Sequence, residues 1–158
     1  MFHRWRISHA RGLLTLERPD DAAAELAHLP AELQATPEVL ALRGAVLQAQ
    51  ERWSEMESVL AELVVAQPRE AGWWIMWGYA TRRANSVAAA QAVLREAELR
   101  HPRDATIQFN LGCYACQLDQ LAEAASRIRR AMKLDESFAA LVANDEDLAA
   151  LRATGFTA

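Results

Sequence analysis

A spacing of 34 residues recurs along the chain, and it constrains the fold more than any other feature of the sequence. Positions at this spacing hold residues of one kind, in four columns: Gly44, Gly78 and Gly112; Leu60, Leu94 and Ile128; Leu63, Ala97 and Ala131; Met56, Ala90 and Ala124. A fixed period between about 20 and 50 residues is typical of proteins in which like units stack on their neighbours. The sequence therefore predicts a stack of repeated units.

The columns place four repeats, at residues 3–36, 37–70, 71–104 and 105–138, within a single domain spanning 1–158. The first repeat is degenerate, and a fifth column of apolar residues links it to the others: Trp5, Val39, Trp73 and Ile107. Residues 139–158 follow the last repeat. We expect them to form capping helices that cover its apolar face.

Each repeat reads as two antiparallel helices. The chain has only six Gly and five Pro, and its commonest residues lose little side-chain freedom in a helix. In the second repeat Thr36 is expected to cap with its hydroxyl and Pro37 to open the first helix, which runs to about Gln50. A second helix, beginning near Trp53, then carries its apolar residues three and four positions apart, as on one helical face. The fold class is all-α.

The third repeat carries a recognisable motif: Trp74-x-x-Trp77-Gly78, followed by Ala90, Leu94, Ala97 and Pro102. A helix-turn-helix of 34 residues with this motif resembles the tetratricopeptide repeat (TPR) of bacterial proteins. The resemblance implies a right-handed superhelical α-α solenoid of helix hairpins. The chain departs from the motif at Arg43, where a large apolar residue is usual, and at Gln108, where Trp is usual.

In that family the first helix of each repeat lines a concave wall that holds a segment of a partner protein. The resemblance implies the following partner-binding residues here: Leu42, Ile75, Met76, Tyr79, Arg82, Arg83, Phe109, Asn110, Cys113 and Gln117. One subgroup of the family grips a terminal carboxylate with converging basic side chains. The corresponding positions hold Ala41, Ala45, Met76, Thr106 and Asn110, which argues against such a clamp.

The expected partner offers an apolar helix or extended segment to Ile75, Met76, Tyr79 and Phe109, with an acidic flank near the two arginines. An alternative remains open from the sequence. Apolar helix faces usually belong to a core, so Met76 and Phe109 are also consistent with packing between repeats or against the chain's own terminal helices.

Cys113-x-x-Cys116 is the one spacing that invites a chemical interpretation, because redox pairs and zinc sites use it. The pair falls in the middle of an expected helix, after Gly112, whereas redox pairs sit at a helix start. The four histidines show no spacing suited to a metal. We therefore predict that Cys113 and Cys116 are two small residues that line the groove. We expect the protein to bind no metal and no cofactor.

The sequence offers no support for an enzyme, since it holds no phosphate loop, nucleophile elbow or paired helical histidines. The net charge of -4 and the absence of a long basic tract argue against nucleic acid. No apolar stretch is long enough to span a bilayer, and the N-terminus does not resemble a secretory signal. We expect a cytoplasmic protein.

The N-terminal residues 1–12 mix aromatic and basic side chains, an arrangement that would suit an anionic membrane surface. The segment is too short to anchor the chain alone. Since Trp5 falls in the fifth column, we instead expect it to pack in the first repeat. Self-association is a further option, because 37–70 carries a net charge of -3 and 71–104 a net charge of +2.

These features predict a non-catalytic adaptor or scaffold that binds a partner segment. Two alternatives stay open. One is a secretion-type chaperone that shields an apolar client segment. The other is a cytoskeletal accessory protein, because small bacterial kinesin light chains are similar in size and repeat type, a resemblance that implies a bacterial tubulin-like filament as partner.

Overall fold

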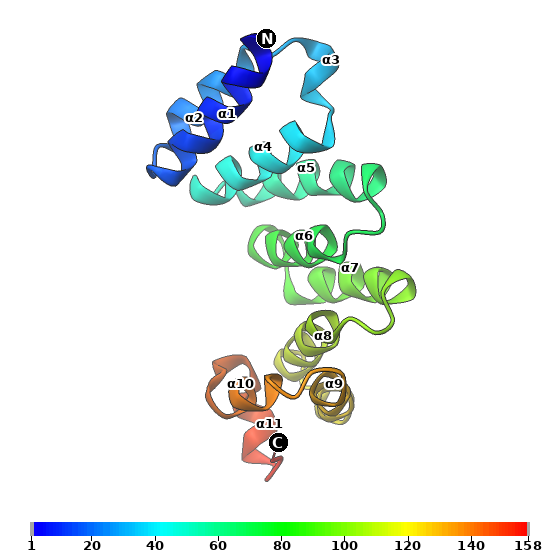
Figure 1. The fold of residues 1–158 in the computed structure, drawn as a ribbon. Helices are drawn as coiled ribbons and strands as arrows, with labels where there is room; N and C mark the ends of the chain where they lie inside the picture. Colours follow the sequence, from blue (N-terminus) through cyan, green and yellow to red (C-terminus); the bar gives the residue numbers. More distant parts are fainter. Residues whose placement is uncertain (1, 158) are drawn as a thin grey trace. The chain divides into compact units, whose positions relative to one another are not determined.

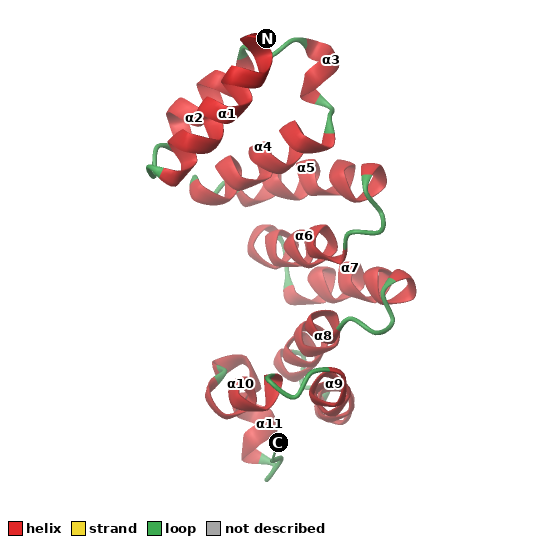
Figure 2. Ribbon diagram, viewed as in Figure 1, coloured by secondary structure: helices red, strands yellow, loops and turns green. Residues whose placement is uncertain are grey.

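The computed structural model describes residues 2–157, and its regular structure is helical (Figure 1). Between these residues no strand is present, and loops join the helices (Figure 2). The helices are α1 (Phe2–Thr15), α2 (Pro19–Ala27), α3 (Ala31–Gln34), α4 (Pro37–Ala49), α5 (Trp53–Ala66), α6 (Ala71–Ala84), α7 (Val87–Arg100), α8 (Ala105–Gln117), α9 (Leu121–Leu134), α10 (Phe138–Asn144), the 3-10 helix η1 (Glu146–Leu148) and α11 (Ala149–Ala153). The predicted all-α fold class is confirmed.

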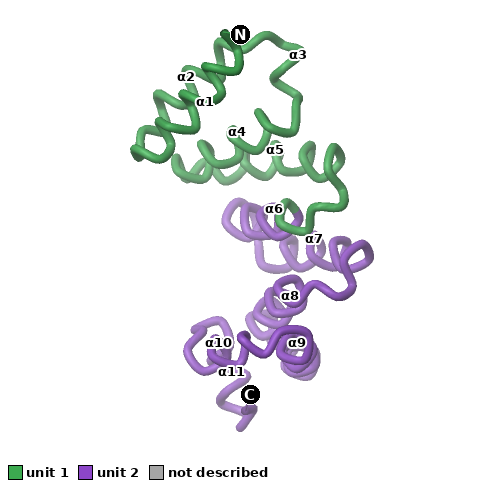
Figure 3. Tube along the Cα trace, viewed as in Figure 1, with its two compact units in different colours: residues 1–73 green, residues 74–158 purple. Residues whose placement is uncertain are grey.

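The chain divides into two compact units, Met1–Trp73 and Trp74–Ala158, with the division inside α6 (Figure 3). Helices α4 and α5 lie within 37–70, and α8 and α9 lie within 105–138. Each of these stretches therefore contains one helix pair. The assignment of the whole chain to one domain stays a prediction.

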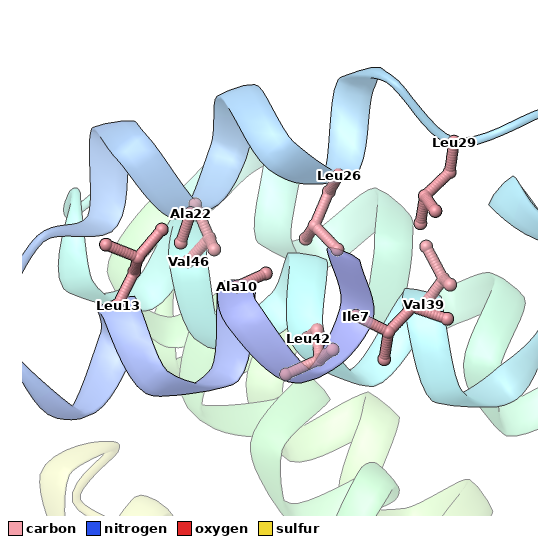
Figure 4. Packing of buried hydrophobic residues seen from close by; sticks show 9 residues of the cluster. All are labelled: Ile7, Ala10, Leu13, Ala22, Leu26, Leu29, Val39, Leu42 and Val46. Atoms are coloured by element: carbon pink, nitrogen blue, oxygen red, sulfur yellow. The ribbon is translucent and has the colours of Figure 1, made fainter. Parts of the chain in front are cut away.

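The core of the first unit is built from apolar residues of α1, α2 and α4 and of the loop after α2 (Figure 4). Its members are Ile7, Ala10, Leu13, Ala22, Leu26, Leu29, Val39, Leu42 and Val46. In α1 and α2 they recur at intervals of three or four residues, which places them on one side of each helix. This core joins α1 and α2 to α4.

Two of the sequence columns meet at the closest approach of paired helices. A Cβ atom added to Gly112 of α8 would lie 2.6 Å from Cδ1 of Ile128 of α9, and one added to Gly78 would lie 2.9 Å from a methyl group of Leu94. Non-bonded carbon atoms prefer about 3.5–4.0 Å. At Gly44 the nearest atom, on Leu60, is 3.8 Å away. The last two repeats therefore require glycine more strictly than the second does.

The start of α4 corrects one detail of the sequence prediction. Pro37 opens the helix as expected, but the Thr36 hydroxyl makes no capping bond to the helix and donates instead to the carbonyl of Leu33, 2.7 Å away. Two later helices use side-chain caps: Ser86 accepts from the amide of Ala89, and Asp104 accepts from that of Ile107. The Thr36 hydroxyl thus stabilises the turn before α4 and does not cap the helix.

Trp5 also departs from expectation. The sequence predicts that it packs in the first repeat, but 54% of its surface is exposed, whereas Val39 and Ile107 in the same column are fully buried. The ring stacks on His9 with centroids 4.7 Å apart, and Ile7 enters the core instead. Among residues 2–157 no helix is both long and apolar enough to cross a membrane.

A partly buried polar network ties α7, α8 and α9 together, and Gln108 stands at its centre with no exposed surface. Its amide nitrogen donates to Glu98 at 2.8 Å, and its carbonyl oxygen accepts from Arg127 at 3.0 Å. Arg127 also pairs with Glu98 directly. Gln108 replaces the usual Trp of the motif with an amide whose donor and acceptor are both used.

The network sets the protonation of Glu98. Burial alone would raise the pKa of this carboxyl, but hydrogen bonds from Arg127 and Gln108 outweigh burial and lower the pKa below its ordinary value. A carboxyl whose pKa is lower in the folded state adds stability above its unfolded pKa, and that stability is lost as the pH falls through the folded pKa. Acid should therefore weaken the contact of α7 with α8 and α9.

We predict that Gly112→Ala destabilises the protein by up to about 2 kcal/mol, because overpacking against Ile128 costs up to about 3 kcal/mol and the gain in helix propensity is only about 1 kcal/mol. Gly44→Ala, which has room for the methyl group, is the matched control and should be neutral or stabilising by up to about 1 kcal/mol. Urea unfolding followed by far-ultraviolet circular dichroism measures both. Equal effects would contradict the packing argument.

We predict that Glu98→Gln lowers the urea midpoint at neutral pH and that its difference from the parent shrinks as the pH falls below about 4.3, the unfolded pKa of Glu. The physical reason is that protonation of Glu98 in the parent removes the same charge. Glu32→Gln, at an exposed position of α3, controls for general charge effects. A difference that stays constant with pH would refute the role given to Glu98.

Candidate partner-binding surface

The predicted partner-binding residues belong to three helices, and α6 carries half of them. Tyr79 is 41% exposed, Ile75 and Met76 are half-buried, and Arg83 is exposed. These four residues, called the α6 strip below, recur at helical spacings of three and four, so they share one side of α6. They combine apolar surface with a positive charge at the helix end.

Leu42 lies in the first unit, and the structure places it in the core of Figure 4, with 8% of its surface exposed. Phe109 and Cys113 of α8 are buried too, and Asn110 and Gln117 are half-buried. Much of the predicted wall therefore has little surface of its own. The burial on α8 has a specific cause.

Residues 138–153, called the closing segment below, fold back along α8. Its first aromatic ring, Phe138, meets the ring of Phe109 with centroids 4.9 Å apart, and both η1 and α11 contact α8. Within the segment, Arg152 donates to the carbonyls of Val142 and Asp145 at 2.9 and 2.6 Å. The closing segment is thus a small folded cap over the face that carries Phe109.

An ion pair holds the centre of the closing segment. Both terminal nitrogens of Arg82 donate to the carboxylate of Asp147, at 2.7 and 3.1 Å, and Gln117 also donates to it. The hydrogen bond to Asp147 raises the pKa of Arg82 above its ordinary value despite partial burial. A bidentate pair of this kind fixes geometry as well as charge. It joins α6 to η1 through an acidic side chain.

The two cysteines of α8 lie in buried surroundings. Both thiols are free and buried, and burial, reinforced by the carboxylates of Asp145 and Asp147, raises the pKa of Cys113 far above its ordinary value. Burial likewise raises the pKa of neighbouring Tyr114 to about 12. A thiol that stays protonated at neutral pH is a poor nucleophile.

The same residues form a cluster with metal-ligand atoms. The Cys113 sulfur and carboxylate oxygens of Asp145 and Asp147 lie within 4.8 Å of one another. A metal would have to displace Arg82 from Asp147 and deprotonate a thiol whose pKa is raised. The guanidinium already supplies the positive charge that this acidic turn requires. The absence of a metal site remains a prediction.

The fold-back of the closing segment does not follow in detail from the sequence. Capping at a helix start accounts for part of the acidic run at 145–147, since Asp145 accepts from the amide of Asp147 at 2.9 Å. No pattern in the sequence indicates that Asp147 pairs with Arg82, 65 positions earlier. Opposite charges this far apart become neighbours only through the packing of α6, α8 and η1.

No model of a protein family matches this chain, and no curated protein matches it. Solved structures do. A MamA structure from Desulfovibrio magneticus RS-1 is similar over 97% of this chain and 89% of its own, with a TM-score of 0.73 and 16% identity. A thermophilic TPR protein from Thermus thermophilus is similar over 96% of this chain and 87% of its own, with a TM-score of 0.65 and 19% identity.

The pilF protein of Pseudomonas aeruginosa is similar over 96% of this chain and 72% of its own, with a TM-score of 0.66 and 16% identity. These likenesses decide the fold. The chain has the fold of a TPR protein. At such low identities they carry the fold alone, so the partner must be argued from the residues of this chain.

We predict that Arg82→Met speeds the chemical labelling of Cys113 in a Cys116→Ala background, where it is the only thiol. Loss of charged hydrogen bonds worth about 1.5–3 kcal/mol should let the closing segment open about tenfold or more often. Removing a cation cannot speed the reaction through charge, because Arg82 itself lowers the pKa of Cys113. The measurement is the rate of reaction with Ellman's reagent.

Arg11→Met is the matched control for this prediction. It removes a more exposed ion pair, between Arg11 and Glu38 at 2.9 Å in the first unit, and exposed pairs contribute about 0–1 kcal/mol. The labelling rate should then equal that of the Cys116→Ala parent. A rate for Arg82→Met no faster than the parent's would show that the ion pair does not hold the segment closed.

Proposed function

We propose that the protein is a non-catalytic adaptor that binds a segment of another protein on the α6 strip. The observation that carries this proposal is the exposure of Tyr79, a large amphipathic ring, beside half-buried Ile75 and Met76. Tyr is enriched at the centre of protein interfaces because its ring is large and its hydroxyl can bond at the edge. The TPR fold is consistent with this role.

The chemistry of the partner follows from the charges at the end of α6. Arg82 and Arg83 occupy its last turn, and Arg82 already holds one carboxylate, that of Asp147. The closing segment thus gives an example, within this chain, of an acidic segment bound beside α6. We infer that the partner offers an apolar side chain to Tyr79 and an acidic residue toward Arg83.

Several of the other predicted partner-binding residues are covered by other parts of the chain. Phe109, Cys113 and Gln117 face the closing segment, so a partner could reach them only if that segment moved away. Leu42 belongs to the hydrophobic core of the first unit. The proposal therefore centres on the α6 strip and does not depend on them.

The class of partner is also a proposal. The proposed partner is a protein or peptide segment, and a tubulin-like filament or an apolar secretion client are the alternatives. Co-pelleting with polymerised filaments would favour the first alternative. Maintenance of a client's solubility in proportion to added protein would favour the second.

We predict that Tyr79→Ala weakens partner binding at least about tenfold, the effect of losing about 1.4 kcal/mol at an interface centre. Leu99→Ala is the matched control, because Leu99 on α7 is 76% exposed and lies outside the strip. Proteins captured from lysate by the parent but not by Tyr79→Ala would be identified by mass spectrometry. The affinity of each purified candidate would then be measured by calorimetry. Equal affinities of Tyr79→Ala and the parent would place the site elsewhere.

A further inference from the structure

The first unit contains an open cleft between α2 and α5, with α4 as its floor. Its volume is about 610 Å³, within the usual range of about 300–1,000 Å³ for ligand sites. The floor and walls include apolar side chains, namely Leu26, Val46, Leu47 and Val59, and the alanines Ala23 and Ala27. Polar side chains of α3, α4 and α5 line the rest, among them Arg43.

The second unit shows how the same repeat positions are filled elsewhere. There α7 and α9 occupy the places that α2 and α5 hold two periods earlier. Two side-chain bridges join α7 to the start of α9: Gln91 donates to Gln120, the residue before α9, at 2.8 Å, and Arg95 donates to Glu123 at 3.0 Å. These bridges span the gap between the two helices.

In the first unit neither bridge forms, because α2 lacks the two side chains that would reach across. The residues two periods of 34 before Gln91 and Arg95 are Ala23 and Ala27, and an alanine side chain cannot reach across. Their would-be partners are Arg52, just before α5, and Glu55 on α5, which pair with each other instead, at 2.7 Å. The cleft therefore opens where two bridging side chains have been replaced by methyl groups.

Arg43 completes the difference between the units. Two periods later the same position holds Leu111, which is fully buried. Arg43 is half-buried and lines the cleft, and among the residues that the structure describes no hydrogen bond or ion pair engages it. Glu62 also lines the cleft, but it makes no ion pair with Arg43. A partly desolvated guanidinium without a carboxylate favours binding of an anion.

We propose that this cleft is a second binding site, and that it accepts a peptide segment of a partner protein in which a carboxylate side chain adjoins an apolar one. The carboxylate would pair with Arg43, and the apolar side chain would lie on Val46, Leu47 and Val59. The cleft lies in the first unit, and none of the residues that line it belongs to the α6 strip. The proposal thus stands or falls separately from the adaptor site on α6.

The test begins with a selection of random linear peptides displayed on phage against the parent protein. Enriched peptides should carry Asp or Glu next to Leu, Ile, Val or Phe. Their affinities are then measured by fluorescence anisotropy for the parent and for variants of the cleft. No enrichment of peptides with this composition would overturn the proposal.

Two variants are designed to remove the site, and we expect both to keep the fold. Arg43→Leu installs the residue type found at the equivalent Leu111, and the double variant Ala23→Gln with Ala27→Arg rebuilds the bridges to Arg52 and Glu55. Each should weaken binding of the selected peptides at least about tenfold, since a hydrogen bond to a charged group is worth about 1.5–3 kcal/mol. Neither should lower the urea midpoint.

Tyr79→Ala is the control, and it should leave the affinity unchanged. Peptides that bind all cleft variants as tightly as the parent would overturn the proposal. Peptides that lose affinity only with Tyr79→Ala would overturn it as well, and would support the α6 strip. Loss of binding in both cleft variants, with the urea midpoint maintained, would establish the cleft as a site for acidic and apolar segments.

Discussion

The close approach of paired helices at the glycine column is the contact on which the rest of the structure depends. At Gly78 and Gly112 no Cβ atom separates the backbone from the branched side chain of the partner helix, Leu94 or Ile128. These contacts recur at equivalent positions of the last two repeats, whereas at Gly44 the nearest atom, on Leu60, is 3.8 Å away. The helices then present equivalent positions to their neighbours, and differences between repeats become differences between surfaces.

The chain uses that equivalence in two ways. In the second unit, polar side chains fill the spaces between helices, and buried Gln108 bridges Glu98 and Arg127 with both of its polar atoms engaged. A satisfied network of this kind specifies one arrangement of three helices. In the first unit, the positions of Ala23 and Ala27 carry no such bridge, so the cleft remains. The same arrangement of helices thus gives a bridged interface between α7 and α9 and an open cleft between α2 and α5.

The sequence predicted the parts of the fold that depend on periodicity. The helix pairs of the last three repeats, the glycine column and the apolar column opposite it all follow from spacing, since a helix that packs on one side must repeat its contacts. Periodicity did not place Trp5, which is exposed although Val39 and Ile107 in the same column are buried. Nor could it show that Thr36 bonds backward, since a hydroxyl before a helix has two local acceptors within reach.

The candidate sites show a related limit. The α6 strip was within reach of sequence reasoning, because it combines helical spacing with an aromatic residue. The burial of Phe109 was foreseen only as an alternative, since its cause, the closing segment, lies outside the repeats. Arg43 was visible as a departure from the motif, yet its meaning depends on Ala23 and Ala27, which lie on another helix. In a repeat chain, binding surfaces are therefore best sought where departures from the repeat on adjacent helices fall beside each other.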